Sequence, residues 1–281
     1  MQKHPEPHAA ASCKPILKWV GGKSRILNQI LPQLPTGRRL IEPFVGGGAV
    51  FLGTNYEEYV LCDRNAHLVE LYSAVANQCE DFLAVAAPYF TEDFRSKEQY
   101  LEVREAFNQE RDPLARAAKF LYLNRFGFNG LCRYNRSGGF NVPYGAPKAL
   151  PRFPADRVHA FRDKARRSSF MCADFADAMR MAERGDVVYC DPPYLPRDDS
   201  TASFTGYTAA RFGIERQKEL AALASDLSAR GIPVVISNHD CEVARQIYKK
   251  ARLITLEARR SVSADSNGRS SVRELLAIFE R

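Results

Sequence analysis

The stretch "RRLIEPFVGGGAVFLGTNYEEYVLCD" (38–63) contains two short apolar segments, separated by a glycine loop and the start of a helix. The first segment, 38–44, runs into three consecutive glycines, and the second, 59–63, ends in an acid. Short apolar runs bounded by turn residues are typical of buried strands. A strand, a glycine loop, a helix and a second strand in this order predict a sheet protein of the α/β class.

The alternation of strands and helices returns in the last third of the chain. A helix is expected at 23–34 and another at 215–230, just before Gly231, because glycine readily adopts the left-handed conformation that ends helices. Further strands are expected at 168–174, 186–191, 232–238, 251–257 and 272–280, although the apolar run of the last segment fits a helix equally well. The pattern predicts a doubly wound, mainly parallel sheet.

The middle of the chain has a different texture. Between about 66 and 126, helical patterns follow one another with little strand character between them. The last of these begins with Pro113, a residue suited to the first helical turn, directly after Asp112 as a cap. We interpret this block as an insertion that divides the chain into a sheet domain, 1–65 with 154–281, and a mainly helical inserted domain, 66–153.

Composition indicates a globular protein, and its moderate positive charge slightly favours an anionic partner. The 281 residues carry a formal charge of +7, and 45% of them are hydrophobic. No apolar run is long enough to span a bilayer, and residues 1–12 lack the apolar stretch of a signal peptide. The seven cysteines are scattered without a CxxC pair, which favours reduced thiols in the cytoplasm over a disulfide framework. The five histidines show no ligand spacing, so no metal site is expected.

Three acids, Glu42, Asp63 and Asp191, fall at the ends of predicted strands, where open α/β sheets bind their ligands. The loop with Gly46 and Gly48 gives backbone access to a nucleotide-like ligand, and Asp63 suits ribose hydroxyls. The loop lacks GxGxxG spacing, and Glu42 would repel a pyrophosphate, so a zwitterion such as S-adenosylmethionine fits better than NAD. Taken alone, the glycines could form a structural turn, and Asp63 could be a solvated or capping acid.

The segment "DVVYCDPPY" (186–194) carries the second cluster of polar groups. A short buried strand ends in Asp191, and two prolines without N–H donors then force the chain out of the sheet. A carboxylate, rigid carbonyl groups and an aromatic ring are therefore expected together at the end of a buried strand. Cys190 points away from Asp191 along the strand, and we interpret it as a buried core thiol.

Five segments resemble those of the Dam-type DNA adenine-N6 methyltransferases, in that family's order and spacing: "LKWVGGK" (17–23), "EPFVGGGAVFL" (42–52), "LYLNRFGFNGLCRYNRSGGFNVPYG" (121–145), "VVYCDPPY" (187–194) and "VVISNHD" (234–240). The resemblance runs from about 16 to 280. It implies a seven-stranded, Rossmann-like methyltransferase sheet with an inserted target-recognition domain that carries a β-hairpin. It also implies a cytoplasmic, nucleoid-associated monomer. Such an enzyme transfers methyl from S-adenosylmethionine to N6 of adenine in GATC of double-stranded DNA, after flipping the base.

The resemblance gives a chemical role to the turn 191–194 at the end of this strand, which we call the corner. The N6 atom of adenine is a poor nucleophile because its lone pair is delocalised into the ring. Asp191 and the carbonyl group of Pro192 would accept its two N–H groups, and Tyr194 would stack on the flipped base. Methyl transfer is then direct, and positioning is the main catalytic effect. The same corner could serve an RNA adenine or protein-amide methyltransferase, and a catalytically silent DNA-binding protein is a third reading.

The resemblance also assigns residues to the cofactor. The positions that match Trp19, Lys23, Asp63 and Asp191 contact S-adenosylmethionine in the family. Trp19 offers an aromatic wall, and Lys23 offers a partner for the methionine carboxylate. Without the resemblance, Trp19 would be interpreted as a core residue and Lys23 as a surface charge. Asp174 is expected to bind the adenine amino group of the cofactor.

Residues 121–155 combine basic and aromatic residues without any Asp or Glu, which favours a nucleic-acid surface over a solvated basic loop. Within this stretch, "RYNRSGGFNVPYG" predicts a hairpin with "SGG" as its turn. The resemblance assigns six positions to DNA: Arg133 to a guanine of GATC, Lys18 to the vicinity of the first guanine, Leu131 and Pro143 to close contacts, and Asn129 and Asn135 to phosphates.

Two loops complete the expected DNA complex. Pro147 stands where close family members carry an aromatic wedge, and a proline can still act as a wedge. The segment 196–209 is polar and rich in small residues, and we predict that it orders over the flipped base as a lid.

Overall fold

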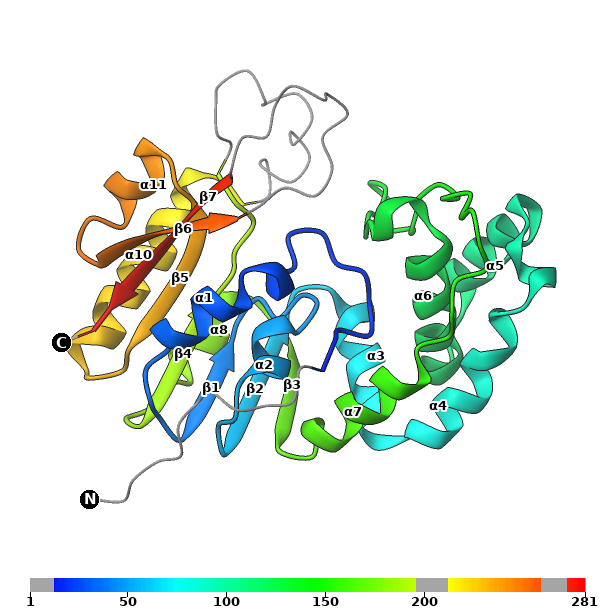
Figure 1. The fold of residues 1–281 in the computed structure, drawn as a ribbon, viewed down its shortest axis with the longest axis horizontal. Coiled ribbons are helices and arrows are strands. Elements are labelled where there is room, and N and C mark those ends of the chain that lie inside the picture. The colour runs from blue at the N-terminus through cyan, green and yellow to red at the C-terminus, as the bar shows by residue number, and fades with distance from the viewer. Residues whose placement is uncertain (1–12, 196–211, 259–271, 281) are drawn as a thin grey trace.

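The computed structural model describes residues 13–195, 212–258 and 272–280, and a seven-stranded sheet forms its centre (Figure 1). The strand order across the sheet is β3-β2-β1-β4-β5-β7-β6. The expected lid at 196–209 lies outside the described residues. The strands are β1 (Arg39–Glu42), β2 (Glu58–Asp63), β3 (Ser168–Cys172), β4 (Asp186–Cys190), β5 (Val234–His239), β6 (Arg252–Ala258) and β7 (Val272–Phe279).

The predicted doubly wound sheet is confirmed. Neighbouring strands from β3 through β5 pair in parallel, whereas β7 pairs antiparallel with both β5 and β6. The ambiguous last segment is a strand, and its residues Leu275 to Ile278 are all buried. A continuous apolar run is buried on both faces of a sheet, so periodicity alone could not distinguish it from a buried helix.

Helices cover both faces of the sheet, and alternate strand residues point to opposite sides. Leu40 belongs to a core cluster with α1, α2, α3 and α7, whereas its neighbour Ile41 belongs to a cluster with α8, α10 and α11. These flanking helices are α1 (Leu27–Ile30), α2 (Ala49–Gly53), α3 (Ala66–Asn77), α7 (Ala155–Ala165), α8 (Phe175–Arg180), α10 (Ile214–Ala229) and α11 (Glu242–Ile247).

The expected continuous helix at 23–34 is wrong. The chain instead forms two 3₁₀ turns around a single helical turn: η1 (Lys23–Arg25), α1 and η2 (Leu31–Gln33). Ile26 leaves the helical region with φ −114° and ψ 10°, and Pro32 has no N–H to continue an α-helical ladder. Apolar spacing alone therefore overstated the regularity of this segment.

The remaining helices lie beyond the β3 edge of the sheet, with α3 and α7 between them and the strands (Figure 1). Asp112 caps α6 by accepting a hydrogen bond from the amide of Ala115 at 2.7 Å, and Pro113 occupies the first turn, as expected. The elements of this part are α4 (Cys79–Ala86), η3 (Ala87–Tyr89), η4 (Glu92–Arg95), α5 (Lys97–Gln109), α6 (Pro113–Phe126) and η5 (Phe128–Gly130).

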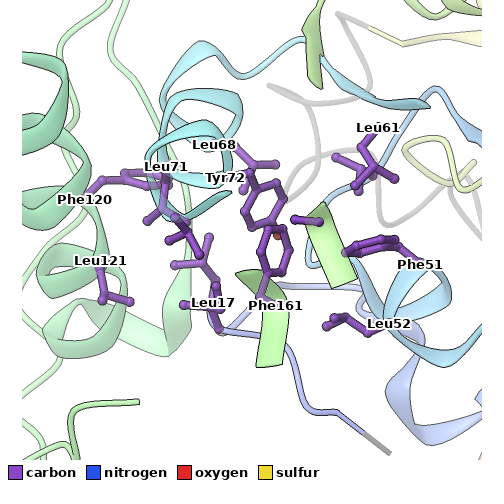
Figure 2. Close-up of a cluster of buried hydrophobic side chains, with 14 of the residues drawn as sticks. Leu17, Phe51, Leu52, Leu61, Leu68, Leu71, Tyr72, Phe120, Leu121 and Phe161 are labelled. Atoms are coloured by element: carbon purple, nitrogen blue, oxygen red, sulfur yellow. The ribbon is translucent and has the colours of Figure 1, made fainter. Parts of the chain in front are cut away.

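One hydrophobic core joins the sheet to these helices. Figure 2 shows Leu68, Leu71 and Tyr72 of α3 between Phe120 of α6 and Phe161 of α7. The same cluster includes residues of β1, β2 and β4. The helix α3 therefore packs on the strands with one side and on α6 with the other, which fixes the helices relative to the carboxyl edge of the sheet. The division of the chain at residues 66 and 153 stays a prediction.

The predicted hairpin is present but short. Single antiparallel bridges join Gly127 to Tyr144 and Tyr134 to Phe140, and the amide of Asn135 donates to the Gly139 carbonyl at 2.8 Å.

All seven cysteines are free thiols, and Cys190 is fully buried as expected. Over the described ranges, the helices lack the length and apolar character that crossing a membrane requires.

Candidate active site

The three acids lie at the carboxyl ends of neighbouring strands. Glu42 is the last residue of β1, Asp63 is the last residue of β2, and Asp191 directly follows β4. Since β1 lies between β2 and β4 and all three are parallel, their ends meet at one edge of the sheet. This edge is where open α/β sheets bind ligands.

Asp191 is paired through both carboxylate oxygens. Ser237 Oγ donates to Oδ1 at 3.0 Å, and Lys23 Nζ lies 2.8 Å from Oδ2. Lys23 is 4% exposed and also donates to the Gly21 carbonyl at 2.6 Å. The side chain of Asp191 keeps 21% of its surface exposed. The carboxylate is thus fixed in direction and still reachable from outside.

Tyr194 lies at the same corner. Its hydroxyl donates to Glu274 Oε2 at 2.9 Å, and its ring meets that of His239 edge to face, with centroids 4.7 Å apart. Lys23 Nζ lies 4.6 Å from the Tyr194 ring centroid. Burial and the nearby charge of Asp191 raise the pKa of Tyr194 well above its ordinary value, so its hydroxyl remains a donor. The tether to Glu274 holds the ring beside Asp191.

The glycine loop after β1 joins Trp19 to Asp63. Gly46 and Gly48 have φ values of 46° and 70°, a left-handed backbone that favours glycine. A Cβ atom at Gly46 would lie 2.7 Å from Trp19 Nε1, so the indole packs directly on the loop. Asp63 Oδ2 accepts a hydrogen bond from the Gly46 amide at 3.1 Å, and Tyr72 of α3 donates to the Gly46 carbonyl at 2.7 Å. Three of the expected cofactor residues therefore share one wall.

Glu42 has an unusual environment. The residue is 2% exposed, and its Oε1 atom has no hydrogen-bond partner in the described part of the chain. Burial and the charge of Asp191 raise the pKa of Glu42 well above its ordinary value. An unpaired buried carboxyl oxygen is costly, so this atom is a candidate acceptor for a ligand group.

Asp174 follows β3 at the same edge, but it already has partners. Its Oδ1 accepts from the Ala176 amide at 3.1 Å as the cap of α8, and Arg216 NH2 lies 2.6 and 2.5 Å from the two oxygens. The Arg216 guanidinium also lies 4.4 Å from the ring centroid of Phe175. Burial opposes ionisation, but the Ala176 amide and Arg216 lower the pKa of Asp174 overall. Asp174 therefore carries a negative charge that Arg216 neutralises.

Lys18 and the hairpin come together through the backbone. Asn124 of α6 accepts from the Lys18 amide at 2.8 Å through Oδ1 and donates to the Lys18 carbonyl at 2.8 Å through Nδ2. Gly130, with φ 65°, lies so close that a Cβ atom there would be 2.4 Å from Lys18 Cβ. A residue near the N-terminus thereby becomes part of the basic surface around the hairpin.

Arg133 is exposed on the hairpin, and its guanidinium is oriented from within. Nε donates to Asn141 Oδ1 at 2.8 Å, and NH2 donates to the Asn141 carbonyl at 2.9 Å. These two bonds use one edge of the guanidinium and hold its plane. Within the described part of the chain, the remaining N–H donors make no hydrogen bond.

Comparison with known proteins identifies the family. The family model described as "D12 class N6 adenine-specific DNA methyltransferase" matches residues 19–262. The chain belongs to this family. It is also similar to curated proteins named DNA adenine methylase, and each match of 264 residues covers 94% of the chain. The identity is 47% for the Serratia marcescens protein, 45% for that of Escherichia coli K12 and 44% for that of Vibrio cholerae O395. The matches cover 97%, 94% and 95% of the length of these three proteins, respectively.

Family membership decides among the functions left open by the sequence. The methyltransferase family acts on adenine in DNA, so this chain is an adenine-specific DNA methyltransferase. Methylation of RNA adenine or of a protein amide could use the same corner around Asp191, but the family to which the chain belongs acts on DNA. The silent DNA-binding reading is disfavoured as well, because the acids, the glycine loop and Lys23 remain assembled at one edge.

The other expected DNA-binding residues of the methyltransferase lie on or beside the hairpin. Asn129 and Pro143 are exposed, and Leu131 is half-buried. Asn135 Oδ1 accepts from the Gly139 amide at 2.8 Å, so its carbonyl oxygen shapes the turn. Pro147, the expected wedge, is half-buried.

Phe128 is an exposed aromatic residue that was not among the residues predicted to contact DNA. It is 48% exposed, and among the described residues it is the aromatic one with a large exposed surface. Asn129 and Gly130, which follow it, both adopt left-handed conformations, with φ values of 53° and 65°. The available signal was the pattern "GFNG" (127–130), an aromatic residue flanked by residues that favour a tight turn.

A possible metal site in the methyltransferase lies elsewhere. Within the described ranges, Cys79, Glu80 and His159 have donor atoms within 4.8 Å of one another. Arg162 NH1 lies 3.1 Å from Glu80 Oε1, and its positive charge disfavours a cation at this position. The expected absence of a metal site stays a prediction.

Proposed function

We propose that the protein transfers a methyl group from S-adenosyl-L-methionine to N6 of adenine in GATC, after the base has been flipped out of duplex DNA. The observation that supports this most directly is the carboxylate of Asp191, held between Ser237 and Lys23 beside the ring of Tyr194. The enzyme acts as a monomer on DNA in the cytoplasm.

The residues at the sheet edge fit the proposed cofactor. Lys23 offers a positive charge for the carboxylate of the amino acid, and the unpaired Oε1 atom of Glu42 gains a partner when a ligand donor reaches it. Asp63 would accept from ribose hydroxyls, and Trp19 with Gly46 would wall the nucleoside. The set that would hold the cofactor is Trp19, Lys23, Glu42, Gly46, Gly48, Asp63, Asp174 and Asp191. When bound, the cofactor supplies an electrophilic methyl group.

The corner prepares the amino group of the target. Asp191 and the Pro192 carbonyl accept the two N–H groups of N6, which returns the lone pair to the nitrogen. Among the described residues no group donates to the Pro192 carbonyl, whereas Gln217 Nε2 donates to the Pro193 carbonyl at 2.8 Å. The Pro192 carbonyl is therefore available for the base. Tyr194 would stack on the flipped adenine and hold it in place.

The hairpin surface would read and hold the DNA. Arg133, with its guanidinium oriented by Asn141, suits a bidentate contact to a guanine edge. Phe128 has the exposed ring that a stacking wedge requires, and we assign it the role expected for Pro147. The proposed DNA-binding set is Lys18, Phe128, Asn129, Leu131, Arg133, Asn135 and Pro143.

Methyl transfer from labelled cofactor onto short duplexes tests the proposal. We expect incorporation into a GATC duplex, and a loss of about tenfold or more for a change at any one of its bases. The Asp191→Ala variant should label no duplex above background. Equal labelling of duplexes with and without GATC would refute the site specificity. Labelling by Asp191→Ala would refute the role of the corner.

A further inference from the structure

Ser237 of β5 is the neighbour of the proposed catalytic acid. Its Oγ atom lies 3.0 Å from Asp191 Oδ1, 3.1 Å from the Tyr189 hydroxyl and 3.3 Å from the Cys190 carbonyl oxygen. Ser237 is completely buried, and β5 pairs with β4 directly before the corner. The contact to Asp191 is thus built on two paired strands, and the serine is buried on its side of the contact.

The direction of these hydrogen bonds follows from the number of protons. Burial and the charge of Asp191 raise the pKa of Tyr189 well above its ordinary value, so its hydroxyl keeps its proton. A serine hydroxyl has one proton to donate, and a carboxylate is a stronger acceptor than a carbonyl. Tyr189 therefore donates to Ser237, and Ser237 donates to Asp191 Oδ1. Hydrogen bonds in such a chain strengthen one another.

The two oxygens of Asp191 are held in different ways. Oδ1 is bound by Ser237, a short side chain on a rigid strand. Oδ2 is bound by Lys23, a long side chain that also lies in the proposed cofactor set. Oδ1 cannot turn away without breaking its buried hydrogen bond to Ser237. Lys23, the partner of Oδ2, would also bind the cofactor.

We propose that Ser237, supported by Tyr189, is a positioning residue that anchors Asp191 by Oδ1 and so presents Oδ2 to the amino group of the target adenine. The inference rests on the proposed role of Asp191. It adds that the orientation of this carboxylate, and not only its presence, sets the rate of methyl transfer. Enzymatic rates are sensitive to displacements of about 1 Å at a reacting group, which makes such an anchor consequential.

The rest of the corner has its own supports. Gln217 of α10 donates to the Pro193 carbonyl at 2.8 Å, and Asn238 Oδ1 accepts from the Leu195 amide at 3.2 Å. These bonds hold the backbone on either side of Tyr194 without help from Ser237. Removing the Ser237 hydroxyl should therefore loosen the carboxylate, while these bonds and the bond from the Tyr194 hydroxyl to Glu274 hold the corner and its tyrosine.

The test is the Ser237→Ala variant in single-turnover methyl transfer onto a GATC duplex. We expect a rate reduction of about 10- to 100-fold, while the affinities for cofactor and duplex stay within about twofold. A duplex with 2-aminopurine at the target position reports flipping without an N6 group, and its fluorescence increase should be unchanged. Ser228→Ala, a buried serine on α10 away from the corner, is the matched control and should retain the wild-type rate.

Two further variants separate positioning from folding and from the proposed function. Tyr189→Phe keeps the Ser237 hydroxyl but removes the tyrosine hydroxyl that donates to it. We therefore expect a smaller reduction of the methyl-transfer rate, about threefold, again without weaker binding of cofactor or duplex. A wild-type single-turnover rate in Ser237→Ala, or in Tyr189→Phe if Ser237→Ala does not fold, would overturn the inference. Asp191→Ala is the parallel measurement: activity in that variant would instead overturn the proposed function.

Discussion

The acidic side chains at the site differ in how many of their oxygens have hydrogen-bond partners. Fully paired carboxylates are held in place, whereas an unpaired oxygen can still accept a hydrogen bond from a ligand. Asp191 is held through both oxygens, and Asp174 is neutralised by Arg216. Glu42, at the end of the neighbouring strand β1, keeps an unpaired oxygen among the described residues. Natural proteins leave such atoms unpaired mainly where a ligand supplies the missing partner, so Glu42 combines a stability cost with a proposed binding role.

The cost at Glu42 predicts a pH dependence of stability. Its pKa is raised on folding, so between its ordinary pKa and the raised value the folded state holds the extra proton, and the free energy of unfolding falls as pH rises. Glu42→Gln removes this titration. In cofactor-free protein, we expect the stability of Glu42→Gln relative to wild type to be greater at pH 8 than at pH 5 in urea denaturation. An unchanged difference between the two pH values would contradict the assignment.

Arg133 predicts a change in sequence preference. Arg133→Ala should lose about 1–3 kcal/mol of discrimination at the guanine that it contacts, because it removes a bidentate donor. The measurement is the ratio of methylation rates on a GATC duplex and on a duplex with that guanine replaced. Arg136→Ala, an exposed arginine near the same turn, should lower binding to both duplexes alike. Equal discrimination by the two variants would contradict the role of Arg133.

At the scale of elements, tight turns place the proposed functional groups at the ends of strands and helices. The loop from Gly46 to Gly48 adopts left-handed conformations that bring its backbone against Trp19 and Asp63. The turn at Asn129 and Gly130, which directly follows Phe128, is also left-handed, and it brings the hairpin against Lys18. In both places a strand or helix supplies rigidity, and a short turn supplies the reach.

The glycine loop can be tested with a matched pair of substitutions. Gly46→Ala combines backbone strain with a clash, since its Cβ atom would lie 2.7 Å from Trp19 Nε1. Gly138 on the hairpin has a similar strained backbone, with φ 85°, but open space around it. We expect Gly46→Ala to weaken cofactor binding by about tenfold or more and to change Trp19 fluorescence. Gly138→Ala should leave both unchanged, and an equal loss in the two variants would show that strain alone is responsible.

At the scale of the whole molecule, a continuous core connects the sheet edge to the hairpin surface. Leu68, Leu71 and Tyr72 of α3 belong to this core, α3 contacts both the strands and α6, and Tyr72 also donates to the Gly46 carbonyl. The helix that follows β2 therefore supports the glycine loop, the sheet and α6 together. The distance between the surface that would read DNA and the corner that would modify it is consequently fixed by side-chain packing.

This shared core predicts that the sheet and the inserted helices unfold together. Trp19, the only tryptophan, reports on the glycine loop, and far-UV circular dichroism reports mainly on the helices. We expect both signals to give one coincident transition in urea. Leu71→Ala should lower the free energy of unfolding by about 2–5 kcal/mol in both signals. Two separate transitions, or a Leu71→Ala effect on one signal alone, would contradict a common core.

Much of the fold was predictable because it depends on local patterns. The strand and helix alternation, the cap at Asp112 and the acids at strand ends all follow from residue types at short spacing. The segment 23–34 was mispredicted because apolar spacing does not register the break at Ile26. The strand 272–279 could not be chosen over a helix, since burial on both faces hides the period of the side chains.

The sequence by itself determined the sheet class and the resemblance to adenine methyltransferases, and it predicted the chemistry of the corner at 191–194, because each depends on residues adjacent in the chain. The tertiary structure decided which distant groups meet: Lys23 and Ser237 on Asp191, Arg216 on Asp174, and Lys18 against the hairpin. These pairings depend on strand order and side-chain packing. Both are set by the burial of the whole core, and no local pattern in the sequence encodes them.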